Sequence, residues 1–224
     1  MHYSNLAHGS AVNLARTKYA PLNLLFGMTV IVPWLEPLDP NSAEDIKMSD
    51  YLMHTRSDWN WSPLITGDYS AITRTVINSS VLPVYSAEEQ TMLENSMDFL
   101  ALNYYSSNYI QANNSTSLGY TVTNLRNNVP IGPVAESTWL TVYPPGIRNI
   151  TNWAWKAFNL TVYLTECGVS VPNEASMPLS QIVQDDFRVS FFQGHVDNLL
   201  KAIVEDKVPI KVFVAWALLD NFEW

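Results

Sequence analysis

The feature that most constrains the fold of this chain is an alternation of four short apolar runs with helix-forming segments. The runs cover residues 24–32, 98–110, 161–165 and 210–217. They are rich in β-branched, aliphatic and aromatic residues, and turn-forming residues lie between them, which is typical of strands. Because helices separate the strands, the order predicts an α/β fold with a parallel sheet and right-handed crossovers.

Helix signals occupy most of the segments between these runs. Helices are predicted over residues 3–19, from Ser42 to about Met53, from Ser86 to about Met97, over residues 144–158 and over residues 179–205. Ser42 and Ser86 are N-cap residues followed by acidic side chains. Residues 34–37 and 59–75 are predicted to be loops. Residues 113–142 form a long polar excursion after the second strand, with a hairpin around 120–125, and such long loops are usually functional.

Composition excludes several functional classes. A length of 224 residues suits one domain with a sizeable core, so residues 1–224 are expected to form a single domain. The net charge of −9 argues against nucleic acid or an anionic membrane surface as a partner. No apolar run approaches the roughly 18 residues of a membrane helix. No metal-ligand spacing and no glycine-rich phosphate loop is present, so no metal or cofactor is expected.

The sequence leaves the cellular location open. The first residues lack a basic stretch followed by an apolar block, so no signal peptide is expected in this chain. Secretion is weakly favoured by six Asn-x-Ser/Thr sequons. They begin at Asn60, Asn78, Asn113, Asn114, Asn149 and Asn159.

The third apolar run ends in a carboxylate, Glu166, directly before Cys167 and a glycine. A charge at the end of a buried strand is costly unless it is paired or lies in a cleft, and parallel sheets place their chemistry at these strand ends. A structural role, in a helix cap or an arginine pair, is the alternative. Cys167 could be a nucleophile, but a lone cysteine is more often a small core residue. Glu36 and Glu223 are further candidate acids.

Four segments together resemble glycoside hydrolase family 1, the β-glucosidases and their relatives. They are Asp98–Ser107, Trp139–Gly146, Tyr163–Val169 and Ala215–Trp224. Their order and spacing are those of the family across nearly the whole chain. The resemblance implies a partial (β/α)₈ barrel covering about the last four βα units. It also implies a retaining β-glycosidase that hydrolyses O-glycosyl bonds through a glycosyl-enzyme intermediate.

The resemblance also implies catalytic roles. Glu166 matches the nucleophile of the family's Thr-Glu-Asn-Gly motif, in which Cys167 replaces the asparagine. Asn103 and Tyr105 match the Asn-Tyr-Tyr motif, and Tyr105 is expected to hydrogen-bond the nucleophile.

Substrate-binding roles follow in the same way. Trp216, Glu223 and Trp224 match residues that hold the glycone, and Trp139 matches an aromatic platform on the aglycone side. The expected partner is a β-glucoside or a related small glycoside or oligosaccharide. Neither the glycone nor the aglycone is specified further.

Part of the family pattern has no counterpart. The Asn-Glu-Pro motif that carries the general acid/base is absent, and Leu35-Glu36-Pro37 aligns with a different segment of the family. Four βα units would leave two strand edges unpaired. The alternative is therefore an inactive half barrel that binds sugars or needs a partner chain. Self-association through the open edges is also expected.

Overall fold

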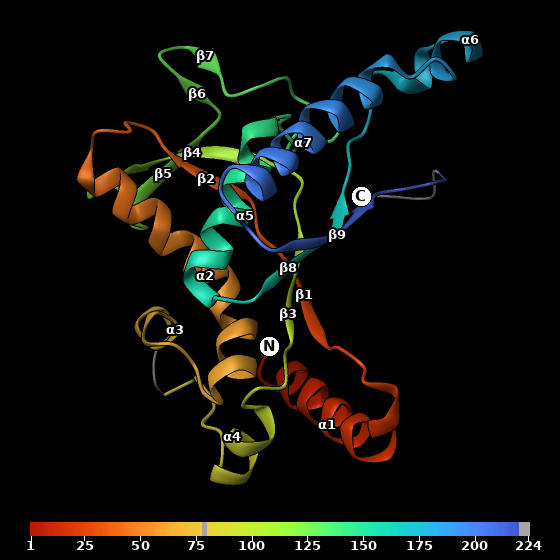
Figure 1. Cartoon of the computed structure of the whole chain (residues 1–224). Coiled ribbons are helices and arrows are strands. Elements are labelled where there is room, and N and C mark those ends of the chain that lie inside the picture. The colour runs from red at the N-terminus through yellow and green to blue at the C-terminus, as the bar shows by residue number, and fades with distance from the viewer. Residues whose placement is uncertain (78–79, 220–224) are drawn as a thin grey trace.

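A four-stranded parallel sheet forms the centre of the computed structural model, which describes residues 1–77 and 80–219. Its strands are β1 (Gly27–Ile31), β3 (Phe99–Asn103), β8 (Thr161–Cys167) and β9 (Ile210–Ala215), in the order β1-β3-β8-β9. Figure 1 shows these strands crossing the middle of the molecule. All three pairings are parallel, so the predicted α/β fold and its four strands are confirmed.

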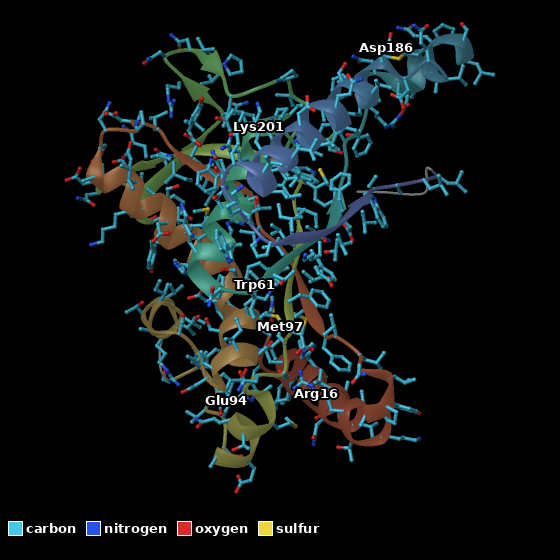
Figure 2. The ribbon with its side chains drawn as sticks, viewed as in Figure 1. Arg16, Trp61, Glu94, Met97, Asp186 and Lys201 are labelled. Atoms are coloured by element: carbon cyan, nitrogen blue, oxygen red, sulfur yellow. The ribbon has the colours of Figure 1, made fainter. Side chains whose placement is uncertain are left out.

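Helices cover one face of this sheet. They are α2 (Ala43–Thr66), α5 (Pro144–Phe158) and α7 (Asp186–Val204). Three further helices, α1 (His2–Lys18), α3 (Ala71–Val76) and α4 (Ala87–Leu93), pack against α2. In Figure 1, α2 and α5 lie together on one side of the sheet. Trp61 of α2 is fully buried, and its indole N–H donates to the carbonyl of Met28 at 2.9 Å. Trp61 is labelled in Figure 2. The core therefore lies between the sheet and these helices.

The strands differ in exposure between the middle and the edges of the sheet. In β8, Val162, Leu164 and Cys167 are completely buried, while Glu166 on the same strand is half-buried. On the edge strands, Ile31 of β1 is 60% exposed and Val214 of β9 is 43% exposed. Both outer strands thus present apolar side chains and unpaired backbone to solvent among the described residues.

Two smaller sheets replace a predicted long strand and a predicted loop. The run 98–110 is divided between β3 and β4 (Ser107–Ala112), which belongs to a second sheet with β2 (Trp34–Pro37) and β5 (Tyr120–Thr123). The prediction of one continuous strand was wrong, as was the loop at 34–37. The chain leaves the central sheet at Tyr104, whose hydroxyl bonds Ser107 Oγ at 2.8 Å and the Tyr143 carbonyl at 2.9 Å. A short hairpin, β6 (Leu125–Arg126) and β7 (Val129–Pro130), completes the predicted excursion.

The predicted loop over residues 59–75 is also wrong, because α2 continues to Thr66 through Pro63 and α3 follows. A proline lacks the N–H that would bond the carbonyl four residues earlier. Here Asn5 of α1 donates to that carbonyl, of Trp59, at 2.8 Å. A side chain distant in sequence thus satisfies the group that the proline leaves free.

The predicted helix over residues 179–205 is interrupted. The structure has η2 (Glu174–Ser176), α6 (Leu179–Ile182) and then α7, with Asp185 in the left-handed region at φ 44°. The Asp185 carboxylate accepts from the backbone N–H of Arg188 at 3.3 Å, so it caps α7. Elsewhere, α4 has the predicted Ser86 cap, in a complete capping box with Glu89, but ends at Leu93 rather than near Met97.

Candidate active site

Glu166 lies at the carboxyl end of β8, between the ends of β3 and β9. The register of β3 against β8 shifts after Leu102, which aligns Asn103 with Glu166. The Tyr104 N–H then donates to the Glu166 carbonyl at 3.0 Å, and the Trp216 N–H donates to the Cys167 carbonyl at 2.9 Å. Three strand ends therefore converge on Glu166.

Tyr105 is the residue that contacts the Glu166 carboxylate. Its hydroxyl donates a hydrogen bond to Glu166 Oε2, and the tyrosine is only 3% exposed. A charge-assisted bond of this kind restricts the rotation of the carboxylate. Next to it, Thr165 Oγ1 donates to Asn103 Oδ1 at 2.6 Å. The expected grouping of Asn103, Tyr105 and Glu166 is thus present as a geometric cluster.

Trp216 is brought to the same place by a close backbone approach. A Cβ on Gly168 would lie 2.0 Å from the carbonyl oxygen of Trp216, so only glycine fits there. The Trp216 indole N–H is buried and has no hydrogen-bond partner within the part of the chain that the structure describes. A buried donor without a partner is costly, and a ligand acceptor would satisfy it.

Trp139 contacts the ring of Tyr105. The residue is 48% exposed, and its ring centroid is 6.2 Å from that of Tyr105 with the planes at 71°, an edge-to-face contact. The other two predicted sugar-binding residues, Glu223 and Trp224, lie outside the described residues.

The remaining candidates have other environments. Cys167 is completely buried among core residues, and this burial raises the pKa of its thiol, so it is a neutral core residue as expected. Glu36 accepts a hydrogen bond from the indole of Trp34 two residues away in β2, within the second sheet. His195 on α7 is likewise completely buried, and its Nε2 has no hydrogen-bond partner among the described residues.

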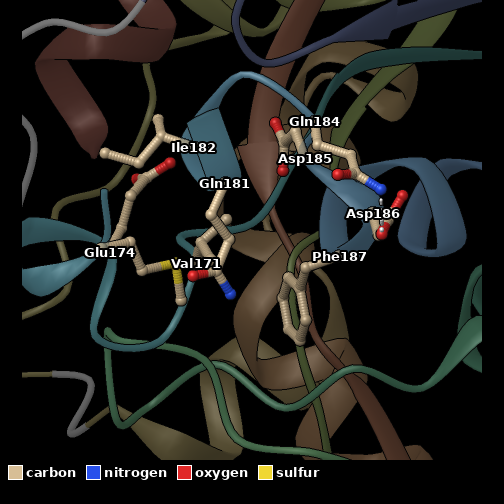
Figure 3. Close-up of a pocket in the computed structure, with 9 residues that line it drawn as sticks. Val171, Glu174, Gln181, Ile182, Gln184, Asp185, Asp186 and Phe187 are labelled. Carbon is tan, nitrogen blue, oxygen red and sulfur yellow. Dashed lines mark hydrogen bonds between the residues drawn. The ribbon is translucent and has the colours of Figure 1, made fainter. Parts of the chain in front are cut away.

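A separate cavity lies in the connection between β8 and α7. It has a volume of about 250 Å³ and lies between α6 and the start of α7, as shown in Figure 3. Two of its carboxylates, Glu174 and Asp185, are paired with Arg188 at 2.8 and 2.9 Å. None of Asn103, Tyr105, Trp139, Glu166 or Trp216 lines it.

Sequence reasoning missed the hydroxyl groups that surround the cluster. Ser106 and Thr141 are 5% and 3% exposed and connect the segment after Tyr105 to the Trp139 segment. Ser170 connects the same segment to the chain after Glu166. The only available signal was the position of each serine shortly after a candidate catalytic residue.

Across residues 1–77 and 80–219, no group of three or more His, Cys, Asp or Glu side chains is arranged to hold a metal ion. Over the same ranges, no helix combines the length and apolar character needed to cross a membrane.

Comparison with known proteins places this geometry in a family. The family model described as glycosyl hydrolase family 1 matches residues 1–224. The chain is 36% identical to raucaffricine-O-β-D-glucosidase of Rauvolfia serpentina over 236 residues, covering 100% of this chain and 43% of the relative. It is 35% identical to β-glucosidase 12 of Oryza sativa subsp. japonica, covering 100% of this chain and 45% of that protein.

Solved structures give the same result. A family 1 β-glucosidase from the fungus Humicola insolens, solved in complex with glucose, superposes with a TM-score of 0.93 at 32% identity, covering 100% of this chain and 48% of its own. A rice β-glucosidase in a covalent complex with glucose gives a TM-score of 0.92 at 30% identity, covering 100% of this chain and 49% of its own. The chain therefore spans about half the length of the relatives that it matches, which is consistent with a partial (β/α)₈ barrel.

Proposed function

Because this chain belongs to glycosyl hydrolase family 1, we propose that it supplies the nucleophile side of a retaining β-glucosidase site. The observation that carries this proposal is the hydrogen bond between the Tyr105 hydroxyl and the Glu166 carboxylate at the end of β8. Strand ends on this face are where barrel enzymes carry their catalytic groups.

In the proposed reaction, Glu166 attacks the anomeric carbon of a β-glucoside. The bond from that carbon to the aglycone oxygen breaks, and the oxygen leaves with the electron pair. Water then cleaves the ester between the sugar and Glu166, so two inversions retain the configuration. Tyr105 orients the carboxylate, and Asn103, bound to Thr165, supports the strand end beside it.

Substrate binding would involve the aromatic side chains around Glu166. Trp216 has a buried indole N–H that a sugar hydroxyl would satisfy, and we assign Trp139 to the aglycone side on the family pattern. We assign Glu223 and Trp224 to the glycone on the family pattern alone.

Retaining glycosidases need a second carboxyl group, about 5–5.5 Å from the first, to protonate the leaving oxygen. We infer that this chain does not supply it and that residues 1–224 form one incomplete barrel domain. Glu166 alone would then displace only an aglycone that leaves as a stable anion, such as dinitrophenolate.

The second candidate function is a catalytically inactive half barrel that binds sugars or needs a partner chain. The exposed edges β1 and β9, with Ile31 60% and Val214 43% exposed, favour it. Edges of this kind pair readily with another chain, so we also propose self-association through them.

A trapping experiment separates the two functions. The folded chain would be treated with 2,4-dinitrophenyl 2-deoxy-2-fluoro-β-D-glucoside, and its peptides would be analysed by mass spectrometry. The expected result is one fluoroglucosyl group on Glu166 and none on the Glu166→Gln variant, with slower labelling of Tyr105→Phe. Binding of glucose-like ligands without any adduct would support the inactive alternative.

A further inference from the structure

The sequons of this chain occupy very different places in the fold. A glycan on an asparagine is bulky and must extend into solvent, so its asparagine has to be exposed once the chain has folded. The described sequons lie within α2 and α5, in the hairpin between β4 and β5, and between α5 and β8. Asn78 lies outside the described residues. Burial therefore separates the positions that could carry a glycan from those that could not.

Two sequons lie in helices that pack on the sheet. Asn60 of α2 is 7% exposed, its Oδ1 is buried without a hydrogen-bond partner in the described chain, and Ser62 of the same sequon is 8% exposed. Asn149 of α5 is half-buried, and it precedes Ile150 and Thr151, which are completely buried. A glycan at either asparagine would disrupt close packing around its helix.

Asn113 and Asn114 are neighbours in the turn between β4 and β5, but their surroundings differ. Asn113 is half-buried and holds the turn, because its Oδ1 accepts from the Ser115 N–H at 3.0 Å and its N–H donates to the Gly119 carbonyl at 2.8 Å. Asn114 is exposed, as is Ser115 after it. The turn therefore offers Asn114 to solvent.

Asn159 is exposed at the opposite end of α5 from Pro144. It is the C-cap of this helix, in the left-handed region at φ 53°, and its N–H donates to the Trp155 carbonyl at 2.8 Å. Asparagine is one of the few residues that adopt this conformation readily. Lys156 and Ala157 before it are also exposed, so the helix end leaves room for a large substituent.

We propose that Asn114 and Asn159 are the positions at which this chain accepts N-linked glycans in the secretory pathway. Asn60, Asn113 and Asn149 carry none in the folded protein. The donor is an oligosaccharide on a lipid diphosphate. Nδ2 of the asparagine attacks C1 of the first sugar, the bond from C1 to the diphosphate oxygen breaks, the lipid diphosphate leaves with the electron pair, and Nδ2 loses one proton.

A glycan at Asn159 would leave the candidate active site open. The whole length of β8 separates Asn159 from Glu166, about 20 Å at about 3.3 Å per residue. Labelling of Glu166 by the fluoroglucoside should therefore be the same with and without this glycan. The inference does not depend on the proposed function, since it concerns positions away from Glu166.

The test is to secrete the full chain from cultured mammalian cells behind an added cleavable signal sequence. The folded, secreted protein is treated with peptide N-glycosidase in water labelled with heavy oxygen, which converts each glycosylated asparagine to labelled aspartate. Its peptides are then analysed by mass spectrometry. Label is expected at Asn114 and Asn159, and none at Asn60, Asn113 or Asn149.

Variants check the assignment by intact mass. Asn114→Gln and Thr161→Val should each remove the mass of one glycan. Thr161→Val destroys the sequon of Asn159 but keeps the left-handed residue itself, and valine has the β-branched shape that suits β8. The matched controls, Ser62→Ala and Asn149→Gln, destroy the sequons in α2 and α5 and should remove no glycan.

Label at Asn60, Asn113 or Asn149 in the folded protein would overturn the proposal, as would the absence of label from Asn114 or Asn159. If little protein is secreted, the chain is translated into microsomes instead. Its protease-resistant, folded fraction is then mapped in the same way, and the same outcomes decide.

Discussion

His195 allows a quantitative prediction of how stability depends on pH. The side chain is completely buried on α7, and its Nδ1 bonds the Phe191 carbonyl at 2.7 Å. Its Nε2 has no partner within the described chain, and its ring lies 3.9 Å from that of Phe191. Protonation would place a charge on a nitrogen with no acceptor, so burial lowers the pKa of His195 from 6.5 to about 4.

The sign follows from proton linkage. Below pH 6.5 the unfolded chain binds a proton at His195 that the folded chain refuses until about pH 4, so stability falls as the pH falls through this window. With these two pKa values, the linkage relation gives a loss of about 2 kcal/mol at about pH 5 and almost none at about pH 7.5. The loss comes from one buried side chain.

The assay is urea unfolding of wild type and His195→Leu over this pH range, followed by circular dichroism. The leucine variant changes the absolute stability, but only wild type should carry the His195 contribution. On acidification to about pH 5, wild type should therefore lose about 2 kcal/mol of unfolding free energy relative to the variant. A difference that stays constant with pH would refute this reasoning.

Three further predictions concern other parts of the molecule. Burial lowers the pKa of His54, but the hydrogen bond and charge of Asp58 and the charge of Asp50 outweigh this, so the pKa is raised overall. Wild type should therefore lose stability relative to His54→Gln as the pH rises from about 6.5 through this raised pKa. Equal pH profiles of the two proteins would contradict it. Gly168→Ala should destabilise the chain by about 1–3 kcal/mol in urea unfolding, because its Cβ would overlap the Trp216 carbonyl; wild-type stability would exclude that close approach. In light scattering, the measured mass should rise with protein concentration above the 25.3 kDa of one chain. The Ile31→Lys variant, changed on the open edge, should show a smaller rise. A mass that stays at that of the monomer at all concentrations would argue against edge pairing.

Local sequence signals were reliable where the deciding interaction is also local. Ser86 begins α4 in a capping box with Glu89, three residues away. The runs at 161–165 and 210–217 became β8 and β9, since side-chain alternation and β-branching act within a few residues. Helix α5 begins at Pro144 as expected.

The errors occurred where a distant group, or a backbone conformation that apolar periodicity does not report, decides the outcome. Residues 59–75 were predicted to be a loop, but α2 continues through Pro63, where Asn5 satisfies the free carbonyl of Trp59. Apolar periodicity suggested one helix across Asp185, yet its left-handed backbone and side-chain cap start a new helix there. No window of sequence contains both members of the Asn5–Trp59 pair.

The sequence by itself determined the strand–helix order, the family and the candidate residues at the strand ends. The pairing of Tyr105 with Glu166 was expected from the family resemblance alone. Only the tertiary structure decided the geometry of this contact, because the hydrogen bond spans 61 positions and the register of β3 against β8 shifts beside it. The same holds for Ser106 and Thr141, whose hydroxyl groups form a hydrogen bond with each other only once folding buries them together. Pairwise contacts over such distances are set by packing and register, and local propensity carries no information about them.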